Sequence, residues 1–306
     1  MNPKALLTLL ALGATWGASF LFIKVIVEET SALEVAEGRL FFGAVAVAAV
    51  LAIRRTRMNW RAFLWLRVAV WALVGLVVPF VLIAWAEEHI ASGTASILNS
   101  TMPLFTTLFA TIFLMEEGFT PMRGAGLVVG FLGVLVLTGG DVYDLSDSSV
   151  LGQLAVVGAA ACYGAAAVYA RSLLKQADPV GLSGGQLVLG AALALPIMLG
   201  VRGTPDYSLS TEAWLSLLTL GILGTGIAIV AYTWLIDNVG SVRSSLVTYI
   251  VPIVGLFLGW AVLDESIDVN TVLGCALIIS GVAAVMRGQA PSTARLPATV
   301  DVIAAE

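Results

Sequence analysis

Long apolar segments, each nearly free of charged residues, recur along the 306-residue chain and are separated by short polar connections. Most are close to the ~20 residues that an α-helix needs to cross the hydrocarbon core of a bilayer. Inside lipid such a segment must be helical, because a helix satisfies its backbone polar groups within one segment. The pattern therefore predicts ten transmembrane helices, near residues 5–27, 33–53, 64–86, 91–115, 121–139, 150–171, 179–200, 212–235, 241–263 and 269–286.

The composition agrees with this prediction and excludes a soluble enzyme. Hydrophobic residues make up 59% of the chain and charged residues 11%, whereas a soluble domain carries roughly 25% charged residues. The net charge of -5 and the lack of a basic cluster outside one short loop argue against nucleic acid as a partner. The sequence thus predicts an all-α integral membrane protein that is surrounded by the lipid bilayer.

Lysine and arginine residues are distributed unequally between the two sides of the predicted bundle. If the N-terminus is cytoplasmic, that side receives twelve of them and the opposite side keeps two, Lys24 and Arg202, while Arg39 lies within the second span. The positive-inside rule then places both termini in the cytoplasm of a multi-pass protein, which we expect in a bacterial inner (plasma) membrane. Residues 288–306 show no apolar period, and we expect a disordered cytoplasmic tail there.

The two halves of the chain resemble each other at an offset of 147 to 149 residues. Each half contains five spans, an odd number, so the second half starts on the opposite side of the membrane. We therefore predict two inverted five-helix repeats, residues 1–140 and 141–287, which offer two near-equivalent states as in many secondary transporters. The pairs that keep residue type and order are Gly38/Gly185, Gly43/Gly190, Trp85/Trp234, Pro103/Pro252, Glu116/Glu265, Gly126/Gly274 and Gly133/Gly281.

Several motifs resemble the ten-span EamA-type members of the drug/metabolite transporter superfamily, over both halves of the chain. They are "WGASFLFIK" at Trp16–Lys24, Arg39 early in the second span, the spacing of Pro103 and Glu116, and "GCALIISGV" at Gly274–Val282. The resemblance implies a monomeric fold of two inverted five-helix units around a central cavity. It also implies export of amino acids, related metabolites or drugs. In the second half Gln186 replaces the arginine and Tyr163 the tryptophan, so the halves need not contribute equally to the site.

Polar residues in the fourth and ninth spans form two matching stripes. Ser96, Asn99, Ser100 and Pro103 follow the spacing of one helical face, and Ser245, Thr248, Tyr249 and Pro252 stand at the corresponding positions. Polar side chains inside a membrane are costly and usually face a cavity or a partner helix, so the stripes could bind a zwitterion or could serve close helix packing. We expect the two prolines to kink their helices.

Trp16 lies too deep in the first span for an interfacial anchor. It could stack on an apolar or aromatic part of the substrate, or fill the core of the bundle. The predicted substrate-binding residues are Trp16, Ser96, Asn99, Ser100, Tyr163, Gln186, Ser245, Thr248 and Tyr249.

Charged residues gather at one end of the first two spans, where Lys24, Glu37 and Arg39 are candidates for gating or coupling. Glu37 lies furthest into its span, and desolvation there would suit a proton-coupled carboxylate. The alternative, which we favour, is an ion-pair gate or structural bridge in which Lys24 or Arg39 keeps Glu37 charged. Glu116 and Glu265 stand at span ends, where a capping role or a loop ion pair is expected.

The sequence does not contain the residues that a zinc enzyme or an ATP-driven pump requires. The single histidine, His89, leaves no pair for a zinc site, and no HExxH or GxxxxGK[ST] motif occurs, so we expect neither a metal nor another cofactor. An intramembrane enzyme would also need a base or a second aspartate inside the membrane.

Glycines at Gly126–Gly130, Gly274 and Gly281 allow close helix approach, so we expect spans five and ten to pack together as a scaffold. Packing between two molecules is the competing interpretation.

Together these features predict a secondary-active carrier that exports small organic solutes by alternating access around a central cavity. Amino acids or related metabolites are the expected substrates. A drug, xenobiotic or nucleoside-type metabolite exporter of the same fold is the alternative.

Overall fold

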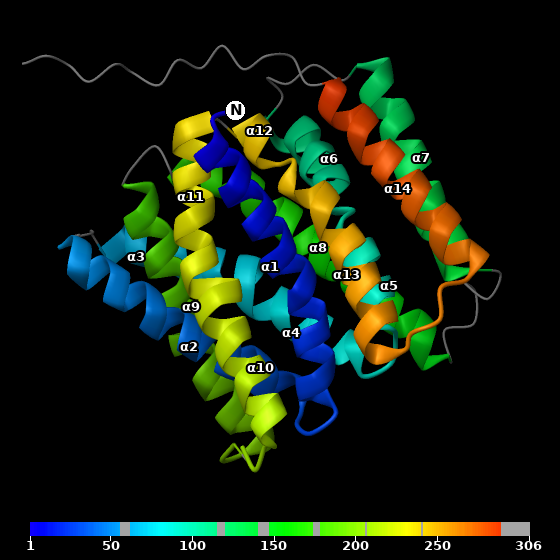
Figure 1. Ribbon diagram of the computed structural model, residues 1–306. Coiled ribbons are helices and arrows are strands. Elements are labelled where there is room, and N and C mark those ends of the chain that lie inside the picture. Colours follow the sequence, from blue (N-terminus) through cyan, green and yellow to red (C-terminus); the bar gives the residue numbers. More distant parts are fainter. Residues whose placement is uncertain are drawn as a thin grey trace, which may run out of the picture.

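The computed structural model describes residues 1–55, 62–114, 120–139, 147–173, 178–205, 207–239 and 241–288. Within these ranges the chain forms a bundle of helices without strands (Figure 1). The predicted tail after Gly288, and Glu116, lie outside the described residues. The helices are α1 (Pro3–Val27), α2 (Ala32–Arg54), α3 (Ala62–Ala72), the π-helical η1 (Leu73–Val77), α4 (Val78–Glu87), α5 (Ser92–Asn99), α6 (Met102–Leu114), α7 (Pro121–Thr138), α8 (Ser148–Leu173), α9 (Pro179–Arg202), α10 (Thr211–Gly221), the π-helical η2 (Ile222–Ile227), α11 (Ala228–Val239), α12 (Ser241–Ser244), α13 (Val247–Leu263) and α14 (Val269–Arg287).

Each predicted span corresponds to one helix or to a run of consecutive helices. In the described part of the chain, nine stretches are long and apolar enough to cross a bilayer, and the shorter helix α13 accounts for the remaining span. The third and eighth spans are the runs α3–η1–α4 and α10–η2–α11, and the fourth and ninth are α5–α6 and α12–α13. The prediction of an all-α multi-span membrane protein is therefore confirmed, whereas the inversion of the halves and the side of the termini stay predictions.

The two halves share one order of elements: two long helices, a helix that contains a π-turn, a broken helix and a final long helix. The π-turns begin at Leu73 and Ile222, which are 149 residues apart. In the second of them the hydroxyl of Thr225 donates to the carbonyl oxygen of Leu220, five residues earlier, at 2.9 Å. Such turns are rare and occur mostly near functional sites.

The related prolines of the fourth and ninth spans have different effects. Pro103 lies in the first turn of α6, directly after the chain turns at Ser100–Thr101. Because proline has no N–H and restricts the residue before it, a new helix starts well there. Pro252 instead lies inside α13, and the turn in that span comes earlier, at Ser245–Leu246. The helix face expected over Ser96 to Pro103 is therefore interrupted.

Helices α7 and α14 pack against each other along glycine residues, as expected for spans five and ten. A Cβ atom on Gly126 would come within 2.7 Å of the carbonyl oxygen of Gly281, and one on Gly133 within 2.7 Å of the amide nitrogen of Ile278. A Cβ atom on Gly281 would also collide with the backbone of Gly130. Small residues of this kind let two helix backbones touch, and this pair stands at the edge of the bundle in Figure 1.

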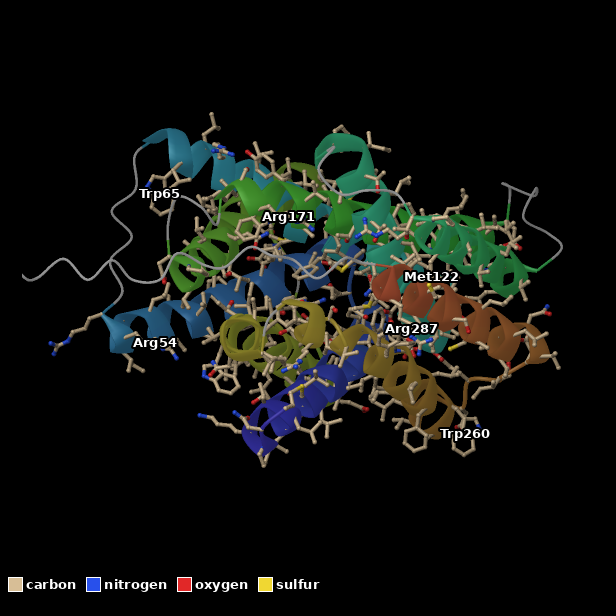
Figure 2. The ribbon with its side chains drawn as sticks, turned by 90° about the horizontal axis from the view of Figure 1, so that it is seen from above. Arg54, Trp65, Met122, Arg171, Trp260 and Arg287 are labelled. Atoms are coloured by element: carbon tan, nitrogen blue, oxygen red, sulfur yellow. The ribbon has the colours of Figure 1, made fainter. Side chains whose placement is uncertain are left out.

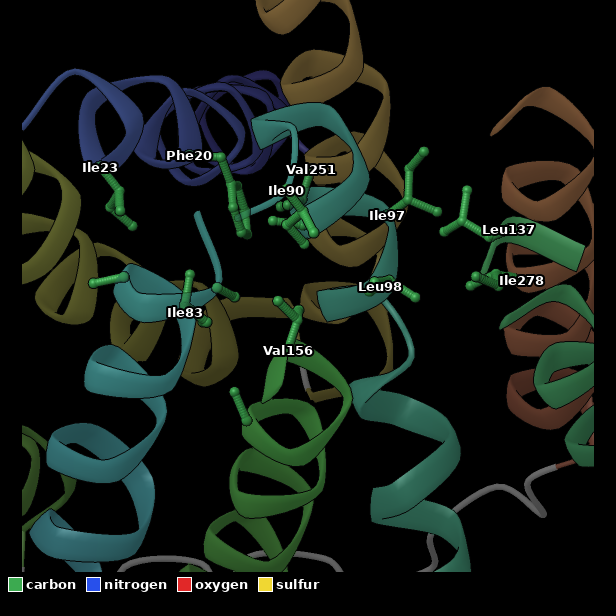
Figure 3. Packing of buried hydrophobic residues seen from close by; sticks show 14 of the residues in the cluster. Phe20, Ile23, Ile83, Ile90, Ile97, Leu98, Leu137, Val156, Val251 and Ile278 are labelled. Atoms are coloured by element: carbon green, nitrogen blue, oxygen red, sulfur yellow. The ribbon is translucent and has the colours of Figure 1, made fainter. Parts of the chain in front are cut away.

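The buried core lies where α1, α4, α5, α8 and α13 converge. Figure 3 shows Phe20, Ile83, Val156 and Val251 directed toward one another, and Ile97 of α5 directed toward Leu137 and Ile278 of α7 and α14. The opposite faces of many helices carry exposed large apolar side chains. In a chain whose surroundings are hydrocarbon this outer apolar surface is stable, because lipid tails take the place of a protein partner.

Candidate functional site

A cavity of about 450 Å³ lies inside the bundle and is lined by helices of both halves. This volume falls within the roughly 300–1,000 Å³ of small-molecule sites. Apolar residues such as Phe20, Ile23 and Phe80 form much of its wall. The polar and aromatic lining residues are Trp16, Ser19, Arg39, Asn99, Ser100, Thr106, Tyr163, Arg171, Thr225, Tyr232, Ser245 and Thr248.

The cavity reaches the end of the bundle at which the N-terminus lies, which we call the open end. Its lining there includes the exposed Arg171 near the end of α8, Met286 near the end of α14 and Ser245 between α12 and α13. Figure 2, which views the molecule from this end, shows Arg171 and Arg287 toward the middle and Arg54 at the periphery. A small solute could therefore enter between α8 and α14.

Trp16 and Tyr232 form an aromatic wall that joins the two halves. The indole N–H of Trp16 donates to the carbonyl oxygen of Gly224 in η2 at 3.1 Å. The Trp16 ring lies 5.2 Å from the ring of Tyr232, centroid to centroid. The π-turn η2 thus holds the indole in place on the cavity wall.

Arg39 is a further member of the cavity wall, although the sequence suggested a place beside Glu37. Its side chain is only 8% exposed. The Nε–H donates to the hydroxyl oxygen of Thr225 at 2.8 Å, and the guanidinium carbon lies 3.8 Å from the centre of the Phe80 ring. The planar guanidinium group of Arg39, its fork of N–H donors, is therefore held by a hydrogen bond to Thr225 from the second half of the chain and by the Phe80 ring from the first half.

Four residues of the two polar stripes line the cavity at the breaks in the helices. Asn99 and Ser100 come from the α5–α6 break, and Ser245 and Thr248 from the α12–α13 break. The hydroxyl groups of Ser100 and Thr248 donate to nearby carbonyl oxygens, at 2.6 and 2.7 Å. The Oδ1 atom of Asn99 is buried and has no hydrogen-bond partner among the described residues, so a small turn of this side chain would offer a bound molecule an unused acceptor.

Three of the predicted substrate-binding residues lie behind the cavity wall. Ser96 is fully buried, donates to the carbonyl oxygen of Gly93 at 2.7 Å and faces a glycine of α13. Gln186 is buried and donates to the carbonyl oxygen of Trp71 at 3.2 Å. The hydroxyl of Tyr249 lies 3.2 Å from the sulfur atom of Met286, which does line the cavity. Ser96 and Tyr249 belong to the interrupted fourth and ninth spans, whereas Gln186 lies in the continuous helix α9.

The opposite end of the bundle, which we call the closed end, is sealed at α5 by Glu265. One carboxylate oxygen accepts from the backbone N–H of Ser92 at 2.6 Å, and the other from that of Gly93 at 2.9 Å. These are the first N–H groups of α5, which have no partner within the helix, and the charge favours the positive end of the helix dipole. The expected capping role of Glu265 is confirmed.

Two more carboxylates join the halves at this end, near the link between α9 and α10. Glu29 accepts from the backbone N–H of Ser210 at 2.6 Å and from its hydroxyl, and these bonds hold the pKa of Glu29 below its usual range. Tyr207 donates to Glu37 at 2.6 Å. Burial, and then this hydrogen bond, raise the pKa of Tyr207, so its phenol stays a donor.

The expected ion pair between Glu37 and a basic residue does not form. Lys24 donates to the carbonyl oxygens of Glu87 and Ile90, at 2.6 and 3.3 Å, and Arg39 donates to Thr225. Glu37 and Arg39 are two residues apart, so they point to different sides of α2. Glu37 bonds to Tyr207 instead, as a structural bridge whose partner is a phenol.

Glu87 is a buried carboxyl group at the end of α4 that sequence reasoning did not single out. It is 0% exposed, and neither of its carboxylate oxygens has a hydrogen-bond partner among the described residues.

Cavity residues that the spacing did not indicate are Ser19, Thr106, Thr225 and Tyr232. A threonine within the glycine-rich "GILGTG" was the available signal for Thr225. In the described residues, no group of three or more histidine, cysteine, aspartate or glutamate side chains could hold a metal ion.

Comparison with known proteins finds relatives over almost the whole chain. The EamA-like transporter family matches residues 3–139 and 150–287. The transporter YoaV of Bacillus subtilis (strain 168) is 29% identical over 280 residues, which cover 91% of this chain and 95% of YoaV. The inner membrane transporter YedA of Escherichia coli (strain K12) is 27% identical over 284 residues, which cover 92% of this chain and 90% of YedA.

Two further matches concern a named exporter and a solved structure. A protein of Streptantibioticus cattleyicolor named "Probable terminal-alkyne amino-acid exporter" is 26% identical over 289 residues, which cover 93% of this chain and 94% of that protein. A crystal structure with 22% sequence identity superposes with a TM-score of 0.65 and covers 93% of this chain and 96% of that one. At this identity the superposition shows a common fold.

Proposed function

The chain belongs to the EamA-like transporter family, and on this premise we propose that it is a secondary-active carrier that exports small organic solutes by alternating access. The names of its relatives describe membrane transporters rather than enzymes. Amino acids or related metabolites are the proposed substrates, in agreement with the relative that is named an amino-acid exporter.

The observation that carries the proposal is a cavity that is built from both halves of the chain and whose lining reaches one end of the bundle, at Arg171 and Met286. A carrier of this kind exposes its site to one side of the membrane at a time, and two inverted repeats supply the matching second state. The repeats are residues 1–140 and 141–287. Because the carrier has no ATP-binding loop of the Walker type in its sequence, the driving force is a gradient.

The proposed location is the bacterial inner (plasma) membrane, with both termini cytoplasmic. The excess of lysine and arginine on that side supports the orientation, and the name of YedA supports the membrane. In this orientation the cavity opens to the cytoplasm, where an exporter loads its substrate. The protein acts as a monomer, since both halves of the site come from one chain.

In the proposed site the substrate lies between the two helix breaks, with Asn99 and Ser100 on one side and Ser245 and Thr248 on the other. Trp16 and Tyr163 cover its apolar part. The residues behind the wall, Ser96, Gln186 and Tyr249, hold the lining in place. Lys24 and Glu37 stabilise the closed end rather than carry a coupling proton.

The test is uptake of labelled amino acids by the purified protein in liposomes, with and without an imposed pH gradient. Uptake above that of empty liposomes is expected for at least one amino acid. Replacement of Asn99 by Ala removes a neutral hydrogen bond of about 1.4 kcal/mol, so kcat/KM should fall about tenfold. The matched control, Arg202→Gln, alters an exposed side chain outside the lining and should transport normally. No uptake of any labelled compound would contradict the proposed function.

A further inference from the structure

The charges on the cavity wall are all of one sign. Among the described lining residues there are two arginines, Arg39 and Arg171, and neither an aspartate nor a glutamate. A cleft lined by one sign of charge between apolar walls focuses its potential on a ligand of the opposite sign. A negatively charged group is therefore the ligand chemistry that this cavity favours.

Arg39 has the geometry to bind that group. A guanidinium carries five N–H donors in a planar fork, and the Nε–H is the one that Thr225 occupies. The two terminal amino groups have no hydrogen-bond partner among the described residues, although the side chain is 92% buried. A carboxylate accepts two parallel bonds from such a fork, and the stacked Phe80 ring keeps the fork aimed.

The buried carboxyl group of Glu87 does not take these donors, because neither of its oxygens accepts a hydrogen bond within the described part of the chain. An unpaired buried cation is costly. A bound anion would relieve that cost, which is a gain that a neutral or cationic ligand cannot offer.

The remainder of the wall has no charged group that would bind an ammonium. Trp16, Tyr163 and Tyr232 present rings, and Phe20 and Ile23 present apolar side chains. The free acceptor, Oδ1 of Asn99, is neutral, so it serves a hydroxyl or an amide as well as an ammonium. The wall thus suits an apolar or aromatic body that has no required positive charge.

We infer that Arg39 forms an anion subsite and that the substrates are small organic acids with an apolar or aromatic body, for which an amino group is dispensable. This inference rests on the proposed carrier function, and it names the substrate class of the same cavity. Amino acids fit through their carboxylate, and acids without an amino group fit equally well.

Three compounds with one phenyl skeleton separate the two charges: 3-phenylpropionate, phenylalanine and phenylalaninamide. Binding to the purified protein in detergent micelles is measured by isothermal titration calorimetry, so that diffusion of the acid through lipid does not matter. The two carboxylates should bind with similar Kd values. The amide, which keeps the ammonium and lacks the carboxylate, should bind at least tenfold more weakly.

The variant Arg39→Gln should weaken the binding of both carboxylates by about a hundredfold or more, because the two charged hydrogen bonds of the guanidinium are lost, and should leave the binding of the amide unchanged. Arg39→Lys keeps the positive charge but lacks the planar guanidinium. Its Kd values for the two carboxylates should lie between those of the unchanged protein and those of Arg39→Gln. The matched control is Arg202→Gln, because Arg202 is exposed at the end of α9 and does not line the cavity. Its Kd values should equal those of the unchanged protein.

An amide that binds as tightly as the acids would overturn the anion subsite, and this comparison needs no variant to fold. The anion subsite would also be overturned if none of the three compounds binds while the liposome panel still shows uptake of a solute. In that case the proposed carrier function stands. No uptake anywhere in that panel would contradict the carrier function, and the anion subsite would then be decided by the binding of the two acids compared with the amide.

Discussion

The two ends of the cavity differ in how the halves of the chain meet. At the closed end, Glu265 and Glu29 accept backbone N–H groups from the other half, and Glu37 accepts a phenol. At the open end, Arg67 reaches Ser172 across the halves through an exposed contact. Buried or backbone-directed bonds to charged groups are strong, and exposed ones contribute little. The difference indicates that the closed end must release a few specific carboxylates before it can open.

The largest effect is expected from Glu265→Ala. Two backbone N–H groups of α5 would lose a charged acceptor, and since each such bond contributes about 1.5–3 kcal/mol, the loss should be about 3 kcal/mol or more. The measurement is SDS unfolding of the detergent-solubilised protein. Glu265→Gln keeps one acceptor oxygen and should lose about half as much.

The same variant tests whether Glu265 closes this end. In a background with Cys162→Ser and Cys275→Ser, a reporter cysteine at the cavity residue Ser19 is labelled with a membrane-impermeant maleimide from the closed-end side. Glu265→Ala should raise the labelling rate. Unchanged labelling together with unchanged stability would contradict the role given to Glu265.

A smaller effect is expected from Tyr207→Phe, which removes the phenol that donates to Glu37. The buried carboxylate would lose a partner, at a cost of about 1–3 kcal/mol in the free energy of unfolding. Glu37→Gln is the companion variant, because an amide oxygen still accepts from the phenol. If proton transport disappears in Glu37→Gln while substrate binding and folding are normal, the structural role of Glu37 is wrong.

The contact of Glu29 should make the closed end weaker in acid. The pKa of Glu29 is lowered in the folded protein by the side-chain and backbone bonds from Ser210. Its contribution is therefore fully present above the pKa of about 4.3 of an unfolded glutamate, and it is lost as the pH falls through the lower folded value. The thermal midpoint should fall in this window. Glu29→Gln should reduce that pH dependence, and an unaltered profile would exclude Glu29 as its source.

The smallest effect is expected at the open end, from Ser172→Ala. The bond from Arg67 to the Ser172 hydroxyl is exposed, so its loss should change the free energy of unfolding by less than about 0.5 kcal/mol. The same SDS titration measures it. A loss as large as that of Glu265→Ala would remove the contrast between the two ends.

The positions of the helices could be predicted from the sequence, since apolar length fixes a span in lipid. The breaks could not, because equivalent prolines behave differently: Pro103 begins a helix and Pro252 lies within one. A continuous helix across Ser96 to Pro103 was therefore the wrong basis for the polar stripe. Asn99 and Thr248 line the cavity nonetheless, whereas Ser96 and Tyr249 lie behind it.

Charge proximity along the chain was a poor guide to the closed end and to the cavity. Glu37 and Arg39 are neighbours in sequence, but a spacing of two residues puts them on different sides of a helix. This spacing can be read from the sequence, and it would have predicted that the structural carboxylate of Glu37 and the cavity arginine Arg39 face different parts of the bundle. The contacts of Glu37 with Tyr207 and of Arg39 with Thr225 join residues about 170 and 186 positions apart, as the chain folds back. The local sequence pattern around a residue does not indicate partners that lie so far away along the chain.

The π-turns occupy corresponding positions in the two halves of the chain. A π-turn is an α-helix with one residue inserted, and it is rare. The described part of each half has one, starting at Leu73 and at Ile222, at the 149-residue offset that also aligns Trp85 with Trp234. Because an inserted residue rotates the rest of its helix, each turn changes which side chains of its span face the cavity. In the second half it places Thr225 on the cavity wall, where the hydroxyl accepts a hydrogen bond from Arg39 of the first half.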